Sequence, residues 1–382
     1  TSLGIYSNSF NGTVGGLTVR ELPGSHLIQP TATSRPTLSS LYNLLTKTEQ
    51  FDDAYWTKTT GTTVTASSAT APDGTLTADT VAYNGTGVPG SYRIYSGTTS
   101  VSITGAGYTA KVWLRADAPV TIAIGGNTAA GVVTSVNVTT DWQQFTISGT
   151  GDGVSVVRLL IYSPAGNNAA FQVYAWGASL TNASDAALPY QRVNTATDYD
   201  YDFSKFPAYL KFDGVDDSLY TAASVDFTST DKMTVFAGVH KASDAAEGML
   251  AETSTGALSG SFWLSMPATV GGPNVLFQSK GTIEKWAVTS SLAAPLTRVV
   301  TGVGDISGDR VTLRLNGTQT SQDATDQGTG NYGNYPLYVG RRNNASLPFN
   351  GRLYQLAIKG KALSAAEIAT VESFVNSKTK AY

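Results

Sequence analysis

From about residue 42 to the C-terminus, the chain is a succession of short segments rich in Thr, Val, Ile and aromatic residues, separated by Gly, Asn and Pro. β-branched and aromatic residues favour strands, whereas Gly, Asn and Pro favour the turns between them. The clearest segment covers residues 108–115, in which the apolar Tyr108, Ala110, Val112 and Leu114 alternate with Thr109, Lys111, Trp113 and Arg115. Many short strands with turn signals between them predict an all-β chain built from antiparallel sandwiches.

Only the last segment of the chain has the period of a helix. Ser364 is a good N-cap, and Glu367 follows it by three residues. An apolar stripe then consists of Ile368, Val371, Phe374 and Val375. This pattern predicts a short C-terminal helix that packs as a lid on a sandwich.

The length and the turn-rich connections divide the chain into four parts. Its 382 residues exceed the roughly 250–300 residues at which single cores stop growing. Residues 1–48, rich in turn signals, predict an irregular arm docked on another surface, with a free disordered tail as the alternative. Residues 49–186 and 207–382 predict two tandem jelly rolls, and residues 187–206 predict a linker between them.

The composition argues against several classes of protein. The chain has no Cys and only two His, which excludes disulfides and thiolate sites and disfavours a His-rich metal site. A net charge of −3 argues against a nucleic-acid partner. No apolar run approaches the roughly 20 residues of a membrane span, so no membrane insertion is expected. The N-terminal Thr-Ser-Leu-Gly shows no signal-peptide pattern, which predicts synthesis in a cytosol.

We call the strand-rich part from about Phe206 to the C-terminus the second block. Five of its motifs occur in the order in which a known family has them. They are Leu-Lys-Phe-Asp-Gly-Val-Asp-Asp-Ser-Leu (210–219), Arg-Leu-Asn-Gly (314–317), Tyr-Val-Gly (338–340), Phe-Asn-Gly-Arg-Leu-Tyr-Gln-Leu-Ala-Ile (349–358) and Leu-Ser-Ala-Ala-Glu-Ile (363–368). With them the block resembles the concanavalin A-like, laminin-G-like jelly rolls. That fold serves lectins, glycosidases, adhesion modules and virion proteins, so the resemblance specifies fold more than function.

The first block, the strand-rich part from about Tyr42 to Tyr190, carries a second set of motifs. They are Asn-Leu-Leu (43–45), Glu-Gln-Phe-Asp-Asp-Ala-Tyr-Trp (49–56), Ala-Pro-Asp-Gly (71–74), Asp-Trp (141–142) and Trp-Gly-Ala-Ser-Leu (176–180). The block resembles jelly-roll carbohydrate-binding modules. Residues 43–56, followed by a Thr-rich strand, are similar to segments of tailed-bacteriophage virion proteins, in which this module often precedes a laminin-G-like one.

The pairing of the two modules implies a non-enzymatic bacteriophage virion protein, such as a capsid decoration protein or a head or tail fibre component. The implied partners are other virion proteins, sister subunits of a homo-oligomer and host-surface polysaccharide. The implied location is the virion surface, after synthesis in the host cytoplasm. Two alternatives stay open: a purely structural decoration or tail protein without glycan binding, and a secreted bacterial lectin or adhesin.

Glycan binding is the sharpest functional hypothesis. Sugars present flat C–H faces, so their sites combine an aromatic platform with polar donors and acceptors. If the strands pair as expected, one basic and aromatic face of the first sandwich carries Lys111, Trp113, Arg115, Arg93, Tyr95, Arg158, Tyr162, Gln172 and Tyr174. The alternatives are that these side chains pack under the arm, against a neighbouring subunit or in the core.

Two acidic clusters are candidate ligands of a structural Ca²⁺, since this ion takes several carboxylate and carbonyl oxygens. They are Glu49, Asp52 and Asp53 in the first block, and Asp213, Asp216 and Asp217 in the second. Neither has the spacing of a dedicated calcium loop, and a solvated turn is the alternative for Asp216 and Asp217. No other cofactor is expected.

Catalysis is not expected. Concanavalin A-like glycosidases carry two Glu at close spacing on one strand, whereas Glu247, Glu252 and Glu284 are isolated in this sequence. His240 follows an apolar segment and is interpreted as a strand-end residue rather than a general base. The sequence therefore favours a binding protein over an enzyme.

Overall fold

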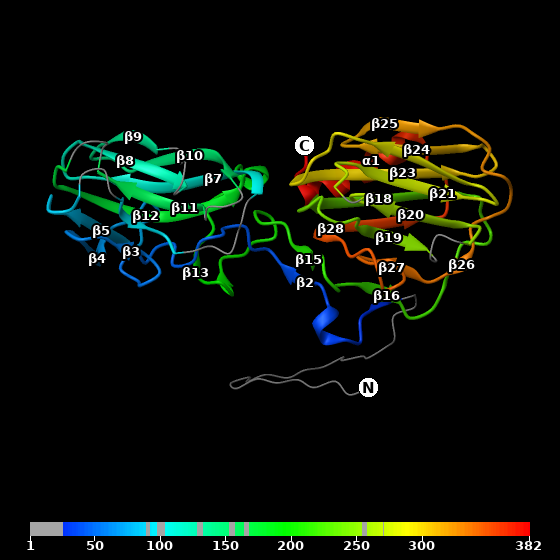
Figure 1. Ribbon diagram of the computed structural model, residues 1–382, viewed down its shortest axis with the longest axis horizontal. Coiled ribbons are helices and arrows are strands. Elements are labelled where there is room, and N and C mark those ends of the chain that lie inside the picture. The colour runs from blue at the N-terminus through cyan, green and yellow to red at the C-terminus, as the bar shows by residue number, and fades with distance from the viewer. Residues whose placement is uncertain are drawn as a thin grey trace, which may run out of the picture.

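The computed structural model describes residues 26–88, 92–97, 104–127, 133–152, 157–163, 168–253, 258–269 and 271–382. These residues form two antiparallel β-sandwiches that lie side by side (Figure 1). The described residues contain a single α-helix, α1 (Ala365–Thr379). The expected all-β fold is confirmed.

The first sandwich consists of two five-stranded sheets. Sheet I has the order β10 (Gln143–Asp152), β7 (Thr104–Arg115), β12 (Phe171–Asn182), β5 (Ala78–Tyr83) and β4 (Thr62–Ala69). Sheet II has the order β3 (Thr57–Lys58), β6 (Tyr92–Tyr95), β11 (Val157–Tyr162), β8 (Val120–Asn127) and β9 (Val133–Val138). The inward residues of both sheets, such as Val112, Leu114, Ile122 and Ile124, form one core.

One end of this core is closed by the segment that contains Phe51 and Trp56. Both rings are buried, and their centroids lie 4.6 Å apart. Asp79 on β5 holds the segment in place, because its carboxylate accepts the backbone N–H of Phe51 at 2.7 Å and that of Ser67 at 2.8 Å. Burial raises the pKa of Asp79 to about 6, so the carboxylate is ionised at neutral pH.

The second sandwich consists of two seven-stranded sheets. Sheet III has the order β1 (Leu27–Ile28), β16 (Leu219–Thr221), β27 (Leu337–Val339), β19 (Met249–Thr253), β20 (Ser261–Ser265), β21 (Val275–Lys280) and β22 (Glu284–Thr289). Sheet IV has the order β2 (Thr37–Ser39), β15 (Tyr209–Asp213), β28 (Asn350–Lys359), β18 (Lys232–Lys241), β23 (Leu296–Asp305), β24 (Arg310–Leu315) and β25 (Thr318–Asp323). Two small ribbons pair β13 (Val193–Thr195) with β14 (Asp198–Tyr199) and β17 (Val225–Asp226) with β26 (Asn334–Tyr335).

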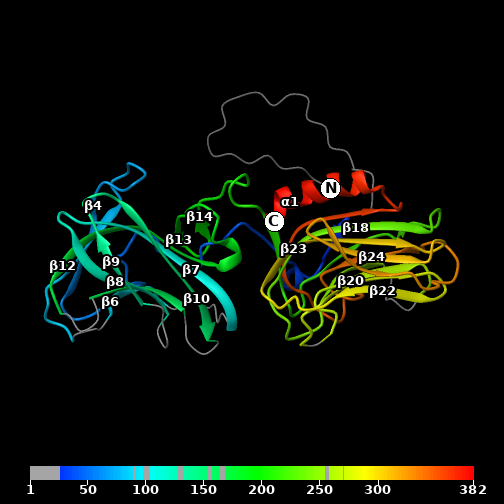
Figure 2. The same ribbon diagram turned by 90° about the horizontal axis from the view of Figure 1, so that it is seen from above.

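Helix α1 covers the outer face of sheet IV (Figure 2). Ile368 and Val375 pack on Phe236 of β18, as expected for a lid. The capping box between Ser364 and Glu367 is confirmed. The expected stripe is wrong at one position: Phe374 is 52% exposed, because it lies on the side of the helix turned away from the sheet.

The described part of the N-terminal arm belongs to the second sandwich. Strand β1 pairs with β16, and β2 pairs with β15, so the arm adds an edge strand to each sheet. Between them, buried Gln29 donates to Ser218 Oγ at 2.9 Å and to Asn344 Oδ1 at 3.1 Å. From residue 26 onward the arm is therefore docked rather than a free tail, and residues 1–25 of the predicted arm lie outside the described residues.

The chain then crosses to the first sandwich and returns, so the two sandwiches share a buried junction. Tyr42, Phe206 and Tyr209 form an aromatic cluster there. Arg352 on β28 reaches across it and donates to Asp185 of the first sandwich at 3.1 Å, with its guanidinium 4.6 Å from the Tyr209 ring centroid. The predicted linker 187–206 is thus packed against both sandwiches over part of its length.

We expect His240 to make the second sandwich sensitive to acid. His240 is buried on β18, its Nδ1 lies 2.9 Å from Thr297 Oγ1, and burial together with the nearby Arg352 lowers its pKa to about 3. The unfolded chain takes up a proton near pH 6.5 and the folded chain does not, so stability is lost as the pH falls below that value. The loss is roughly 1.4 kcal/mol per pH unit. We expect the free energy of unfolding, measured with urea at several pH values, to fall less steeply with decreasing pH in His240→Gln than in the wild type. An equally steep fall in both proteins would contradict this role of His240.

Candidate functional site

The strongest candidate site is the outer face of sheet I in the first sandwich. Trp113 and Arg115 on β7 point outward because Val112 and Leu114 fill the core between them. On the neighbouring strand β12, Tyr174 lies opposite Arg115 in the register. The expected parity of these three residues is therefore confirmed, and their side chains are half-buried.

Trp142, in the loop before β10, completes the face. The Arg115 guanidinium lies 4.3 Å from the Tyr174 ring centroid and 5.6 Å from that of Trp142. Beyond these ring contacts it has no hydrogen-bond or ion-pair partner among the described residues. The Tyr174 hydroxyl donates to exposed Asp117 at 3.0 Å. We call Trp113, Arg115, Trp142 and Tyr174 the aromatic face; it offers ring surfaces beside free guanidinium donors.

Two further aromatic residues, Trp176 and Tyr190, pack in the same cluster as the aromatic face. Trp176 is buried, packs on Tyr190 with ring centroids 4.8 Å apart, and donates to Thr77 Oγ1 at 3.0 Å. The Tyr190 hydroxyl donates to Glu49 at 2.9 Å, and burial together with Glu49 raises the pKa of Tyr190 well above its usual value. These contacts hold the two rings in fixed positions.

Gly177 permits the close approach of Trp113. It has φ +65°, at a register shift between Trp176 and Ser179 on β12. A Cβ at this position would lie 3.2 Å from Trp113 Cδ1, so a larger residue would displace the ring. The bulge in β12 thus helps to set the position of the platform.

Lys111 shares the outer face but does not contribute a free cation. Its ammonium donates to the carbonyl oxygen of Ala186 at 2.6 Å, which ties β7 to the segment that follows β12. Gln172 is exposed on β12, as its parity predicts.

Four of the predicted residues lie on the other sheet, so the expectation of a single basic face is wrong. Strands β6 and β11 belong to sheet II. Arg93 of β6 is fully buried: it donates to Ser163 Oγ at 2.7 Å and to Asn168 Oδ1 at 2.8 Å, and its guanidinium lies 3.8 Å from the Tyr83 ring centroid. Because its donors are used within the fold, Arg93 is a structural residue.

Tyr95, Arg158 and Tyr162 lie on the outer face of sheet II. Tyr95 and Tyr162 pack around buried Leu160, and the Arg158 guanidinium lies 5.0 Å from the Tyr95 ring centroid. These residues face away from sheet I and cannot join Trp113 in one site.

The first acidic cluster does not assemble. Among the described residues, Asp213, Asp216 and Asp217 are the only group of three acidic, His or Cys residues whose ligand atoms converge. Glu49 accepts from Tyr190, whereas Asp53 accepts the Tyr55 N–H at 2.8 Å and pairs with Lys47 at 3.3 Å. The carboxylates of Glu49, Asp52 and Asp53 thus do not converge in this structure, and calcium binding by them stays a prediction.

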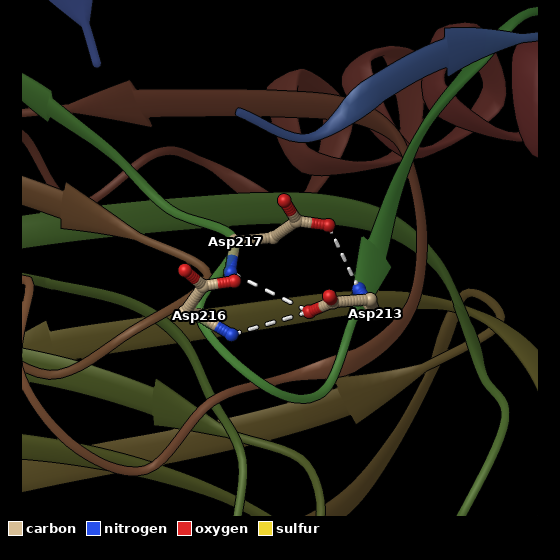
Figure 3. A group of neighbouring side chains, drawn as sticks. All are labelled: Asp213, Asp216 and Asp217. Carbon is tan, nitrogen blue, oxygen red and sulfur yellow. Dashed lines mark hydrogen bonds between the residues drawn. The ribbon is translucent and has the colours of Figure 1, made fainter. Parts of the chain in front are cut away.

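The second acidic cluster does assemble, in the turn after β15 (Figure 3). Asp213 Oδ1 accepts the N–H of Val215 at 2.8 Å and of Asp216 at 3.2 Å, while Asp217 Oδ2 accepts the N–H of Asp213 at 3.0 Å. Asp216 Oδ2 accepts from Ser34 of the arm at 2.7 Å. Much of the acceptor capacity thus stabilises the turn and docks the arm, and calcium binding here stays a prediction.

The sequence interpretation missed Trp142, Trp176 and Tyr190 as members of the site. Trp176 could have been found, because it has the same parity as Tyr174 on one strand. Trp142 and Tyr190 lie outside the strands, so alternation gave no signal for them.

The comparisons with known proteins concern the fold. Residues 212–369 match the Laminin_G_3 family model, described as the Concanavalin A-like lectin/glucanases superfamily. The second sandwich is therefore similar to the concanavalin A-like, laminin-G-like domains over these residues. No curated protein sequence matches the chain.

Several solved structures are similar to parts of this chain. A heptameric SAP-like pentraxin from Limulus polyphemus is 14% identical, with a TM-score of 0.36, over 45% of this chain and 84% of the pentraxin chain. The Ruminococcus gnavus IT-sialidase CBM40 bound to alpha2,3 sialyllactose is 14% identical, with a TM-score of 0.33, over 43% of this chain and 95% of that one. The botulinum neurotoxin type G receptor binding domain is 11% identical, with a TM-score of 0.34, over 44% of this chain and 42% of that one.

In the part of the chain that the structure describes, no helix has the length and apolar character that crossing a membrane requires.

Proposed function

We propose that this protein is a non-catalytic glycan-binding protein, and that it serves as a virion protein of a tailed bacteriophage that attaches the particle to host-surface polysaccharide. The aromatic face of the first sandwich carries the first part of this proposal. The order of the two modules in the sequence, with its resemblance to phage virion proteins, supports the second part.

The aromatic face has the chemistry that sugar binding requires. Half-buried rings of Trp113, Trp142 and Tyr174 offer apolar surface to the C–H faces of a pyranose. The Arg115 guanidinium can donate to sugar hydroxyls, since the described residues leave its donors unused. Asp117 beside Tyr174 adds an exposed acceptor.

Such a shallow site binds single sugars weakly. Many copies on one particle convert weak contacts into useful avidity, because each later contact forms at a high effective concentration. A homo-oligomer of sister subunits, anchored on other virion proteins, would serve the same purpose.

A glycan array tests the binding function. The wild-type protein is expected to bind a restricted set of bacterial polysaccharides, and Trp113→Ala is expected to lose at least tenfold in affinity because the platform is removed. Arg115→Gln, which breaks no hydrogen bond within the described fold, is expected to lose about tenfold to a hundredfold, the range of one hydrogen bond to a charged group. Phe203→Ala, which removes an aromatic ring 61% exposed on the linker, is the control and is expected to bind as the wild type does.

An array without any bound glycan, or equal binding by all four proteins, would contradict the proposed function. The virion location is tested separately, by immunogold labelling of purified phage particles with an antibody against the chain. Labelling of the particle surface is expected, and unlabelled particles would contradict the location.

A further inference from the structure

The outer face of sheet III, in the second sandwich, carries a regular row of side chains across five adjacent strands. The register places Tyr338 of β27, Glu252 of β19, Trp263 of β20, Gln278 of β21 and Trp286 of β22 directly opposite one another. Their neighbours along the strands, Leu264, Phe277 and Ala287 among them, fill the core. The row therefore lies on the outer side of the sheet, opposite the sheet that α1 covers (Figures 1 and 2).

Aromatic and hydrogen-bonding residues alternate along this cross-strand row. Tyr338, Trp263 and Trp286 lie on alternate strands of the sheet, and such strands are about 9.5 Å apart. That distance is close to the length of two sugar rings in an extended chain. Tyr220 of β16 continues the row, with its ring centroid 6.3 Å from that of Tyr338.

One polar member of the row, Gln278, holds a donor without a partner among the described residues. Gln278 is only 1% exposed, and its Nε2 has no hydrogen-bond partner among the residues that the structure describes. Such a buried donor is costly to the fold, and a ligand atom that accepts from it is one explanation for its presence. Trp286, opposite Gln278 on the edge strand, is 47% exposed, so the core does not enclose its ring on the side of the row.

Arg342 places a second unpaired donor beside the middle ring. Its Nε donates to Glu252 at 3.2 Å, and the other carboxylate oxygen of Glu252 accepts the Asn343 N–H at 2.9 Å. The guanidinium is thereby held 4.4 Å from the Trp263 ring centroid, while its Nη2 has no hydrogen-bond partner in the described part of the chain. Trp263, the middle ring of the row, is thus paired with an arginine whose position is fixed by Glu252.

We propose that this row is a second glycan site, which binds an extended oligosaccharide lying across the strands of sheet III. Sugar rings stack on Tyr338 and Trp286 at the two ends and lie over the Arg342–Trp263 pair in the middle. Sugar oxygens accept from Gln278 Nε2 and Arg342 Nη2. Both free groups are donors, and a glycan supplies acceptor oxygens at every ring along its length, which favours it over a peptide as the occupant.

This inference rests on the proposed function for the chemical class of its ligand, but it uses the other sandwich and other residues. Two sites on sandwiches joined through the buried Arg352–Asp185 junction would make a single chain bivalent. Binding of a long polysaccharide would then be tighter than binding of its short fragments.

Gln278→Leu provides the sharpest test. The substitution removes an unsatisfied buried amide, so the melting temperature is expected to stay the same or rise, whereas binding of a long oligosaccharide is expected to weaken at least fivefold. Trp286→Ala is expected to weaken binding similarly. Val288→Ala, which shortens another partly exposed side chain of the same edge strand, is the matched control and is expected to bind within twofold of the wild type.

Isothermal titration of the full chain with long and short fragments of an array-positive polysaccharide is the measurement, repeated in a Trp113→Ala background. Residual binding in that background, abolished by Gln278→Leu, supports the second site. The second site is excluded if Trp113→Ala alone abolishes binding and if the single variants Gln278→Leu and Trp286→Ala bind with the affinity of the wild type. The proposed function stands in that case. No binding by the wild type overturns both. A different outcome is that Trp286→Ala changes the oligomeric mass and keeps the wild-type affinity for the oligosaccharide. That result would assign the row to a contact between copies of the chain and overturn the inference.

Discussion

Replacing Arg352 with Ala is expected to lower the free energy of unfolding by about 3–5 kcal/mol, the usual cost of removing one partner of a buried ion pair. Arg352 and Asp185 are nearly buried, with side chains 11% and 7% exposed, and they join the two sandwiches. Removing the guanidinium leaves the Asp185 carboxylate without this partner at the junction. We therefore also expect calorimetry to resolve two thermal transitions for this variant, one for each sandwich, and a single coupled transition for the wild type.

A surface ion pair near the same junction provides the control. Arg192 and Asp200 lie 2.6 Å apart, but their side chains are 42% and 53% exposed, so Arg192→Ala is expected to cost less than about 1 kcal/mol. A double-mutant cycle of Arg352→Ala with Asp185→Ala isolates the pair energy. Equal effects of Arg352→Ala and Arg192→Ala, or an unchanged single transition, would show that the junction does not couple the sandwiches.

Replacing Asp79 with Ala is expected to destabilise the first sandwich by roughly 3 kcal/mol, because two backbone donors lose a charged acceptor. The carboxylate accepts from Phe51 and Ser67 and is 1% exposed, so water does not readily replace it. Loosening of this end of the sandwich exposes the segment that holds Phe51 and Trp56. Urea unfolding followed by tryptophan fluorescence measures the loss, and hydrogen exchange at the Phe51 and Ser67 amides locates it.

Asp73 is the matched control, because it is an exposed carboxylate that accepts from Thr75 within its own turn. Asp73→Ala is expected to change the free energy of unfolding by less than about 0.5 kcal/mol. If Asp79→Ala unfolds like this control, with unchanged exchange at Phe51, the Asp79 carboxylate does not hold the segment in place.

Alternation along a strand was sufficient to predict which side chains share a face. The period of two assigns Trp113 and Arg115 to the side opposite Val112 and Leu114, because this depends only on local backbone geometry. The sheet that a strand joins depends instead on pairing with distant strands. Arg93 was therefore assigned to the wrong face: β6 pairs with β11, far along the chain, rather than with a strand of sheet I.

The division of the chain into domains has the same physical limit. Strands β1 and β2 contain two and three residues, too few to show a period, and their partners lie about 180 residues further along the chain. The sequence predicted an arm that docks on another surface, but it could not predict that the arm would add edge strands to the second sandwich. Likewise, it could not predict that Asp216 would accept from Ser34 of the arm.

Saturation-transfer difference NMR on the full chain tests the central claim most directly, because it reports which protons of a bound sugar touch the protein. With an array-positive oligosaccharide, we expect strong transfer to the axial C–H protons that stack on aromatic rings, and a marked reduction of that transfer in Trp113→Ala. Absence of transfer for the wild type, or identical transfer patterns for the wild type and Trp113→Ala, would contradict the assignment of the aromatic face as a glycan-binding surface.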